Sequence, residues 1–160
     1  MTGAGAGGKA AGDKAAGDMS DVKAPVFAPL VLAYVGDSVY ELFVRSALTQ
    51  KSGGSVHKLH TEATKYTRCA SQAETVHAIY DKLTEGEKDI VRRGRNTNSG
   101  YVPKNADVAQ YRYATGFEAL IGHLFLSRDF VRLKEVLGLA EQAVKGRAEA
   151  NKTDDKKQTR

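Results

Sequence analysis

Residues 32–45 read LAYVGDSVYELFVR. From Leu30 to Val35 a helix would be apolar on every side, so we expect it to be buried within a domain or against a second chain. Asp37 nevertheless stands in the middle, directly after Gly36. A buried carboxylate is unfavourable unless it is paired or binds a cation, and a mid-helix glycine costs about 1 kcal/mol relative to alanine. We therefore expect Asp37 to face a site that something approaches closely.

A second apolar helix is predicted over residues 114–126, which read ATGFEALIGHLFL with Glu118 as the single acid. For Asp37 alone, a core helix whose acid is held by a local hydrogen bond or by a basic partner is the simpler interpretation. Two buried helices with one carboxylate each instead favour acids that meet around a hard divalent cation with oxygen ligands.

These stretches match a family. Residues 32–42 resemble the signature helix of the ribonuclease III fold, most closely that of its small branch, Mini-ribonuclease III. Residues 92–99, RRGRNTNS, resemble the basic motif of that branch, and residues 111–122, YRYATGFEALIG, resemble its second catalytic helix. The three motifs occur in the order of the family and cover most of residues 26–146, so together they are specific.

The resemblance implies that Asp37 and Glu118 are the catalytic, metal-binding pair and that the cofactor is Mg²⁺, which would neutralise the phosphate and activate water. The larger ribonuclease III enzymes carry two further acids, at positions that are Ala33 and Thr115 here. We therefore expect one tightly held ion, with a second recruited by the RNA phosphate, in place of a full two-metal site.

Other polar side chains near these motifs have simpler explanations. Glu41 either shares the ion or pairs with Arg45 at i, i+4, and the pair is the favoured interpretation. His57 and His60 are spaced like zinc ligands, but no cysteine or third histidine lies nearby, and contact with RNA explains His60 better. Cys69 is the single cysteine, so no intramolecular disulfide is possible; we interpret it as inert packing and expect a reducing, cytoplasmic location.

Binding to RNA calls for cations that meet backbone phosphates, because the deep A-form major groove hides the base edges. Three arginines within four residues, followed by amides, exceed what capping of a helix C-terminus needs. The predicted RNA-binding residues are Arg92, Arg93, Arg95, Asn96 and Asn98, with Lys58, His60, Lys65, Arg68 and Lys104 as weaker candidates. For the weaker lysines and arginine the alternative is a solvated helix face.

Tyr34 stands where the family places an aromatic side chain that inserts into the partner subunit, and with Leu30 and Val31 it is expected to form a homodimer interface. The resemblance implies a double-strand-specific endoribonuclease whose two sites would cut both strands. It also implies maturation of precursor 23S ribosomal RNA, with a ribosomal protein as helper. The alternative is a catalytically inactive, dimeric RNA-binding or ribosome-associated module of the same fold, which the two missing acids favour. An all-α interaction protein without an RNA partner would leave both acids and the arginine cluster unexplained.

The 160 residues predict one domain between two tails, with a formal net charge of +5. Residues 1–24 and 147–160 are expected to be disordered because they have little to bury, which leaves a catalytic domain over 25–146. The fourteen residues of the second tail are too few for a double-stranded-RNA-binding domain, so we expect the catalytic domain, RNA shape or a helper to select the substrate. No apolar run approaches the roughly 20 residues that cross a bilayer, and no signal-peptide pattern is present.

No strand pattern occurs, so an all-α fold of the ribonuclease III endonuclease type is predicted. Helices are expected over 29–48, over 56–83 as one long region, from 85 into the arginine motif, from Asn105 or Asp107 to about 127, and over 130–145. Ser55 and Thr84 are the predicted N-caps, and Thr84 forms a capping box with Glu87.

Overall fold

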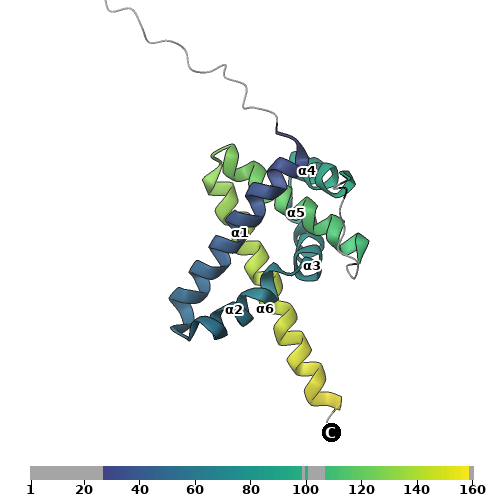
Figure 1. Ribbon diagram of the computed structural model, residues 1–160. Helices are drawn as coiled ribbons and strands as arrows, with labels where there is room; N and C mark the ends of the chain where they lie inside the picture. Colours follow the sequence, from purple (N-terminus) through teal and green to yellow (C-terminus); the bar gives the residue numbers. More distant parts are fainter. Residues whose placement is uncertain (1–26, 99, 101–106, 159–160) are drawn as a thin grey trace, which may run out of the picture.

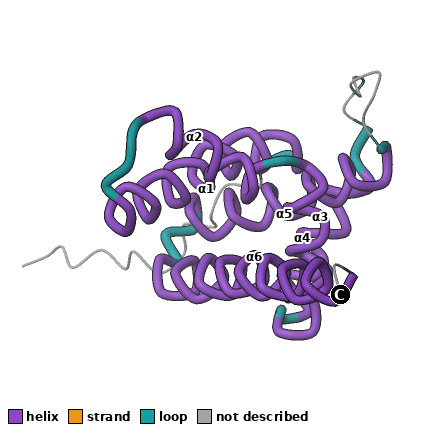
Figure 2. Tube along the Cα trace, turned by 90° about the horizontal axis from the view of Figure 1, so that it is seen from below, coloured by secondary structure: helices purple, strands orange, loops and turns teal. Residues whose placement is uncertain are grey.

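The computed structural model describes residues 27–98, 100 and 107–158, and within them it contains helices and turns but no strand. The helices are α1 (Pro29–Ser52), α2 (Val56–Thr67), α3 (Cys69–Ile79), the 3-10 turn η1 (Tyr80–Lys82), α4 (Glu85–Asn96), α5 (Val108–Leu126) and α6 (Phe130–Gln158). Figure 2 shows the same all-helical trace from below. The predicted all-α class is therefore confirmed. Among the described helices, none combines the length and apolarity needed to cross a membrane.

Helix starts follow the predicted capping residues. The Ser55 hydroxyl accepts the Lys58 amide at the start of α2, at 3.4 Å. At the start of α4, the Thr84 amide donates to the Glu87 carboxylate at 2.8 Å and the Glu87 amide donates to the Thr84 hydroxyl at 3.3 Å, which is a complete capping box. Asp107, one of two predicted starts for α5, is its N-cap. Because these contacts span only a few residues, the sequence alone predicts them.

The expectation of one long helix over 56–83 is wrong. Arg68 has extended backbone angles, φ −65° and ψ 145°, and separates α2 from α3. The reason is tertiary: α2 packs mainly on α1, whereas α3 packs on α5, so the chain must change direction between them. The first helix also runs beyond its predicted end at residue 48, to Ser52, and is closed by Gly53 at φ 46°.

Helix α6 continues to Gln158, so the described part of the tail that was predicted to be disordered from residue 147 is helical. Residues after Gly146 are mostly good helix formers and include no proline. Arg147 also fixes this helix to α3, since its guanidinium donates to the Ser71 hydroxyl at 3.1 Å and the Thr75 hydroxyl at 3.1 Å. The predicted first tail, residues 1–24, lies outside the described residues.

Helix α5 is the central element, and α1, α3, α4 and α6 all pack against it (Figure 1). Phe117, Leu120 and Ile121 of α5 are completely buried, and the ring of Tyr40 meets Phe117 edge-on at a centroid distance of 4.9 Å. Each such side chain contributes about 1.5–3 kcal/mol on burial, so α5 anchors the core.

Two glycines allow α1 and α5 to cross at backbone contact. A Cβ atom at Gly36 would lie 1.8 Å from the carbonyl oxygen of Glu118, and one at Gly122 would lie 1.9 Å from that of Leu32. No other residue fits at either position without movement of a helix. The mid-helix glycine is thus explained by the approach of α5, and this approach places the residue after Gly36 beside α5.

Candidate active site

The crossing of α1 and α5 brings together two carboxylates that are 81 positions apart in the sequence. Asp37 directly follows Gly36, whose backbone meets that of Glu118. Glu118 is half-buried, whereas Asp37 is exposed, so the expectation of a buried Asp37 is wrong. The apolar run before Asp37 had suggested burial on all sides, but the outer face of α1 is open in this chain. The pair therefore consists of a half-buried acid, Glu118, and an exposed acid, Asp37.

The electrostatics of the pair favour a bound cation. Burial, and then the nearby Asp37 carboxylate, raise the pKa of Glu118 to about 8. Burial, and then Glu41, raise the pKa of Asp37 above its usual range. Each pKa rises because negative charge is poorly solvated or repelled there, and a cation between the two groups would remove both costs.

Helix α3 supplies a third side of the site, which the sequence did not predict. Burial and then Glu118 raise the pKa of the Cys69 thiol, with a smaller effect from Asp37, so the thiol stays protonated and fits the predicted inert role. One turn later Gln72 is 1 % exposed. Hydrogen bonding from Gln72 works against the rise in the pKa of Glu118. In the sequence, the only indication that Gln72 belongs to the site is its place beside Ala73 on the predicted buried face of the helix.

The donor atoms fit a hard, partly hydrated cation. Within the described part of the chain, no group of three or more His, Cys, Asp and Glu side chains could hold a metal ion, and this includes His57 and His60. Two carboxylates and a buried carboxamide are oxygen donors, the type that Mg²⁺ prefers, and Mg²⁺ commonly uses one or two carboxylates while keeping several waters. The residues present thus fit Mg²⁺ but not a closed zinc site.

The positions of the two missing acids are filled by packed residues. Ala33 is 5 % exposed and lies in a small cluster with Leu32 and Ala119. Thr115 is 6 % exposed, and its hydroxyl donates to the Tyr111 carbonyl at 3.1 Å. Neither position offers a charged ligand.

Glu41 forms the predicted ion pair with Arg45, with an Nη2 to Oε2 distance of 3.0 Å on the exposed side of α1. An exposed i, i+4 pair of this type adds little to stability.

The arginine motif lies at the C-terminal end of α4, and its side chains differ in how accessible they are to a phosphate. Arg92 and Arg93 are exposed, although Arg92 pairs with Asp89. Arg95 is half-buried, and its guanidinium donates to the Tyr113 hydroxyl at 3.0 Å and to the side-chain oxygen Oδ1 of Asn96 at 3.2 Å. Arg93 therefore has the side chain most open to a phosphate.

The weaker RNA-binding candidates lie elsewhere. Lys58, His60 and Arg68 are exposed on or just after α2, and Lys65 pairs with Glu62 at 2.7 Å. Figure 1 shows α2 and α4 at opposite ends of α1, so the structure does not join the two basic groups into one patch. Asn98 accepts the Gly100 amide at 3.1 Å beside the arginine motif. Lys104 lies outside the described residues.

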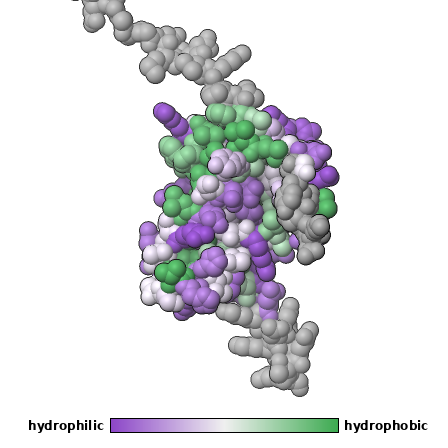
Figure 3. Space-filling view, in the orientation of Figure 1, coloured by the Kyte–Doolittle hydropathy of each residue, from purple (hydrophilic) through white to green (hydrophobic). Residues whose placement is uncertain are grey.

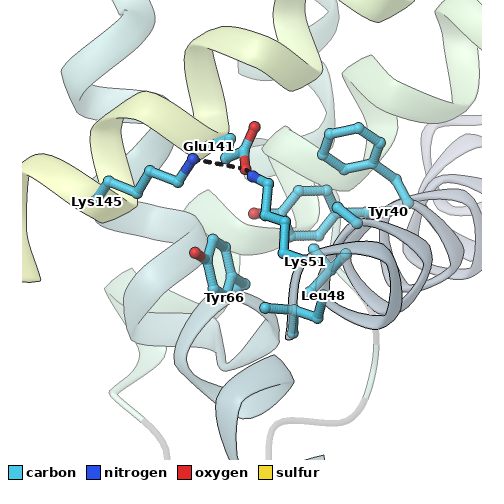
Figure 4. A pocket seen from close by; sticks show the side chains of 9 residues that line it. Tyr40, Leu48, Lys51, Tyr66, Glu141 and Lys145 are labelled. Carbon is cyan, nitrogen blue, oxygen red and sulfur yellow. Dashed lines mark hydrogen bonds and ion pairs between the residues drawn. The ribbon is translucent and has the colours of Figure 1, made fainter. Parts of the chain in front are cut away.

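A cavity of about 40 Å³ lies under the second half of α1, between Tyr40, Leu48 and Tyr66 (Figure 4). Glu141 stands at its edge, paired with Lys51 and with Lys145. The walls are mostly apolar, and the volume suits only a few atoms. This cavity offers no counterpart to the two carboxylates, so the crossing of α1 and α5 is the better candidate.

Apolar side chains are exposed where α1 begins. Tyr34 is 79 % exposed, Val31 45 % and Leu30 36 %. Figure 3 shows hydrophobic residues gathered at this end of the molecule. Contiguous exposed apolar surface of this kind is typical of a protein–protein contact.

A family model, the Ribonuclease III domain, matches residues 30–129. The Mini-ribonuclease 3 of Thermoanaerobacter sp. (strain X514) is 51 % identical over 117 residues, covering 73 % of this chain and 82 % of that protein. The Mini-ribonuclease 3 of Symbiobacterium thermophilum is 47 % identical over 112 residues, covering 70 % and 86 %. A crystal structure of a Fusobacterium nucleatum protein superposes with a TM-score of 0.65 at 25 % identity, covering 72 % of this chain and 93 % of that one.

Proposed function

This chain belongs to the ribonuclease III family, as its relatives named Mini-ribonuclease 3 also indicate, and we propose that it is a magnesium-dependent endoribonuclease specific for double-stranded RNA. Membership of this family makes the chain a ribonuclease. We propose in addition that its cofactor is Mg²⁺, that it prefers duplexes, and that Asp37 and Glu118 are its catalytic residues.

The observation that carries the proposal is the meeting of Asp37 and Glu118 at the crossing of α1 and α5. Two acids from distant parts of the chain are held by a backbone contact that tolerates only glycine at residue 36. Ionising both acids is unfavourable without a metal, since burial, and then the Asp37 carboxylate, raise the pKa of Glu118 to about 8. Such a cost is understandable when a cation and a phosphate normally occupy the site.

Asp37 and Glu118 would hold the Mg²⁺, and Mg²⁺ in such a site supplies charge neutralisation and an activated water for phosphodiester hydrolysis. The remaining protein groups have supporting tasks. The exposed Asp37 faces the side from which RNA would approach, whereas the half-buried Glu118 is fixed by the packing of α5. With Ala33 and Thr115 in place of acids, one ion would be held by the protein and a second would be recruited by the RNA phosphate.

We assign phosphate contacts first to Arg92 and Arg93 at the exposed end of α4, and then to the basic residues of α2. The two groups flank the carboxylate pair along α1, which spans about 36 Å for its 24 residues. Cations spaced along a backbone, without base-reading groups, fit recognition of RNA by shape.

We further propose that the enzyme acts as a homodimer in which Tyr34, Val31 and Leu30 meet a second copy. Their exposure supports this, because apolar surface at the start of α1 is otherwise left uncovered in the described chain. Two sites per dimer would cut both strands of a duplex. Precursor 23S ribosomal RNA as substrate, with a ribosomal protein as helper, and a cytoplasmic location belong to the same proposal.

A cleavage assay tests the proposal. Labelled duplex RNA and its separated strands are incubated with wild type, Asp37→Asn, Glu118→Gln and the control Glu41→Gln in Mg²⁺, Ca²⁺ or EDTA. Wild type and Glu41→Gln should cut the duplex in Mg²⁺ only, whereas the other two variants should bind it, keep the helical circular dichroism and leave it intact. Normal cleavage by Asp37→Asn or Glu118→Gln would refute the site. Binding without cleavage by the wild type would instead favour the catalytically inactive RNA-binding module.

A further inference from the structure

Gln72 is a buried polar side chain whose two ends have no hydrogen-bond partner of normal geometry among the described residues. It is 1 % exposed on the face of α3 that packs on α5. Buried amides in folded proteins nearly always have partners, and an unpaired one destabilises the fold. A well-packed leucine or methionine would avoid this cost. The presence of glutamine therefore needs an explanation other than stability.

The position of Gln72 is set by the packing of α3 along α5. The His77 ring of α3 contacts the Tyr113 ring of α5 at a centroid distance of 4.1 Å. Gln72, five residues before His77, lies close enough to Glu118, five residues after Tyr113, to work against the rise in its pKa. Because α3 is followed backward and α5 forward between these two contacts, the two helices run antiparallel. Cys69, one turn before Gln72, feels both Glu118 and Asp37. This end of α3 thus borders the carboxylate pair.

The neighbours of Gln72 on α3 are occupied elsewhere. Ser71 and Thr75, also buried, accept hydrogen bonds at 3.1 Å from the guanidinium of Arg147 on α6, which also pairs with Glu74 at 3.2 Å. Arg147 therefore fixes the rotation of α3 from the side of α6. Gln72 is the one buried polar side chain of this turn that is left for the site.

From these contacts we infer that Gln72 is a positioning residue: its carboxamide binds the Glu118 side chain and orients it toward Asp37 and the cation that they would share. The inference rests on the proposed function. In this arrangement an N–H of Gln72 donates and a carboxylate oxygen of Glu118 accepts. Groups of this type, which orient the ligands of a metal, commonly change metal affinity 10–100-fold when they are replaced.

The test compares Gln72→Leu and Gln72→Met with Ser71→Ala. Methionine keeps the length and flexibility of glutamine, so at least one variant retains the packing. Ser71 is the matched control, because it is adjacent, similarly buried and bonded to Arg147 of α6. The readouts are the melting temperature, the affinity for Mn²⁺ measured by electron paramagnetic resonance without RNA, and kcat and KM on duplex RNA. Mn²⁺ is the probe because it prefers the same oxygen ligands as Mg²⁺.

Both Gln72 variants should melt at or above the temperature of the wild type, bind Mn²⁺ about 10-fold more weakly or worse, and lose kcat with little change in KM for RNA. Ser71→Ala should melt lower and bind Mn²⁺ normally. If the wild type binds Mn²⁺ and both Gln72 variants bind it equally tightly with unchanged kcat, the inference about Gln72 is wrong and the proposed function stands. A wild type that binds no Mn²⁺ and cleaves no duplex overturns the proposed function, and the inference with it.

Discussion

The backbone of Gly36 meets that of Glu118 so closely that a Cβ atom at Gly36 would lie 1.8 Å from the Glu118 carbonyl oxygen. Gly122 makes the reciprocal approach to Leu32 one turn away. The spacing of the two carboxylates is therefore set by contact between main chains, which is stiffer than any contact between side chains. The fold and the candidate site depend on the same pair of helices.

Gly36→Ala should consequently disrupt both. The added methyl group must push α1 and α5 apart, and overpacking of this kind costs typically about 1–3 kcal/mol, occasionally more. We expect a lower free energy of unfolding in urea and loss of duplex cleavage beyond what the remaining folded fraction explains.

Gly138→Ala is the matched control for this substitution. Gly138 also lies inside a helix, α6, but nothing stands within 4 Å of where its Cβ would be. This variant should be stabilised by about 0.5–1 kcal/mol through the lower entropy of the unfolded chain. A Gly36→Ala protein as stable and active as Gly138→Ala would contradict the close crossing.

The carboxylate pair predicts a fall in stability as the pH rises in the absence of divalent cations. The pKa of Glu118 is about 8 in the folded protein, above its usual value of 4.5. Between these values the folded state binds more protons than the unfolded state, so the free energy of unfolding falls as the pH rises and stops falling above the folded pKa. Urea titrations in EDTA at pH 5.5, 7 and 8.5 measure this. Glu118→Gln should flatten the profile.

Added Mg²⁺ should oppose the same loss. Because the cation competes with the proton for Glu118, it should raise the melting temperature more at pH 8.5 than at pH 5.5. An equal rise at both values, or the same rise in Glu118→Gln, would show that Mg²⁺ acts at another place.

Arg93→Ala should weaken binding of duplex RNA across sequences. Arg93 is exposed at the end of α4, and loss of one phosphate contact should lower the slope of log K against log salt by about 1. Fluorescence anisotropy from 50 to 200 mM salt measures it. Lys134→Ala removes the same charge from the exposed side of α6 and is the control. If both variants lose affinity equally, net charge and not the α4 motif accounts for binding.

Tyr34→Asp should convert a dimer into a monomer, because a charge would replace an aromatic ring at the centre of the proposed interface. Light scattering coupled to size exclusion gives the mass of each species. Val56→Asp, at an apolar position on α2 that is 83 % exposed, should keep the dimer. A wild-type monomer at all concentrations would disprove the interface.

Arg132→Met should destabilise the fold by about 3 kcal/mol at pH 7, because it leaves the buried Glu87 carboxylate without its cation. The guanidinium donates to both carboxylate oxygens of Glu87, at 2.7 and 2.9 Å. The hydrogen bond from Arg132 holds the pKa of Glu87 below its usual 4.5, so this contribution is complete above that value and is lost as the pH falls through the folded pKa. Urea unfolding at pH 7 and pH 3 should show the gap to wild type narrowing in acid. Removing the exposed pair of Lys88 and Glu85 should have little effect at either pH.

Local features of the fold could be predicted from the sequence because they depend on residues a few positions apart. The capping box of Thr84 and Glu87, the N-caps Ser55 and Asp107, and the pair of Glu41 and Arg45 all belong to this class. The candidate acids were found because family motifs marked them, and each lies on a helix that periodicity also predicts.

The remaining features depend on contacts between distant residues, and only the tertiary structure decided them. The break at Arg68 occurs because α2 and α3 pack on different helices, and α6 continues past residue 147 because Arg147 binds α3. No motif in the neighbouring sequence singles out Gln72, because its surroundings form only when α3 packs along α5. By itself the sequence determined which segments are helical and which two acids to examine, since helix capping and periodicity are short-range. The distance between those acids, their unequal exposure and the residue beside them came from the packing of main chains more than eighty positions apart.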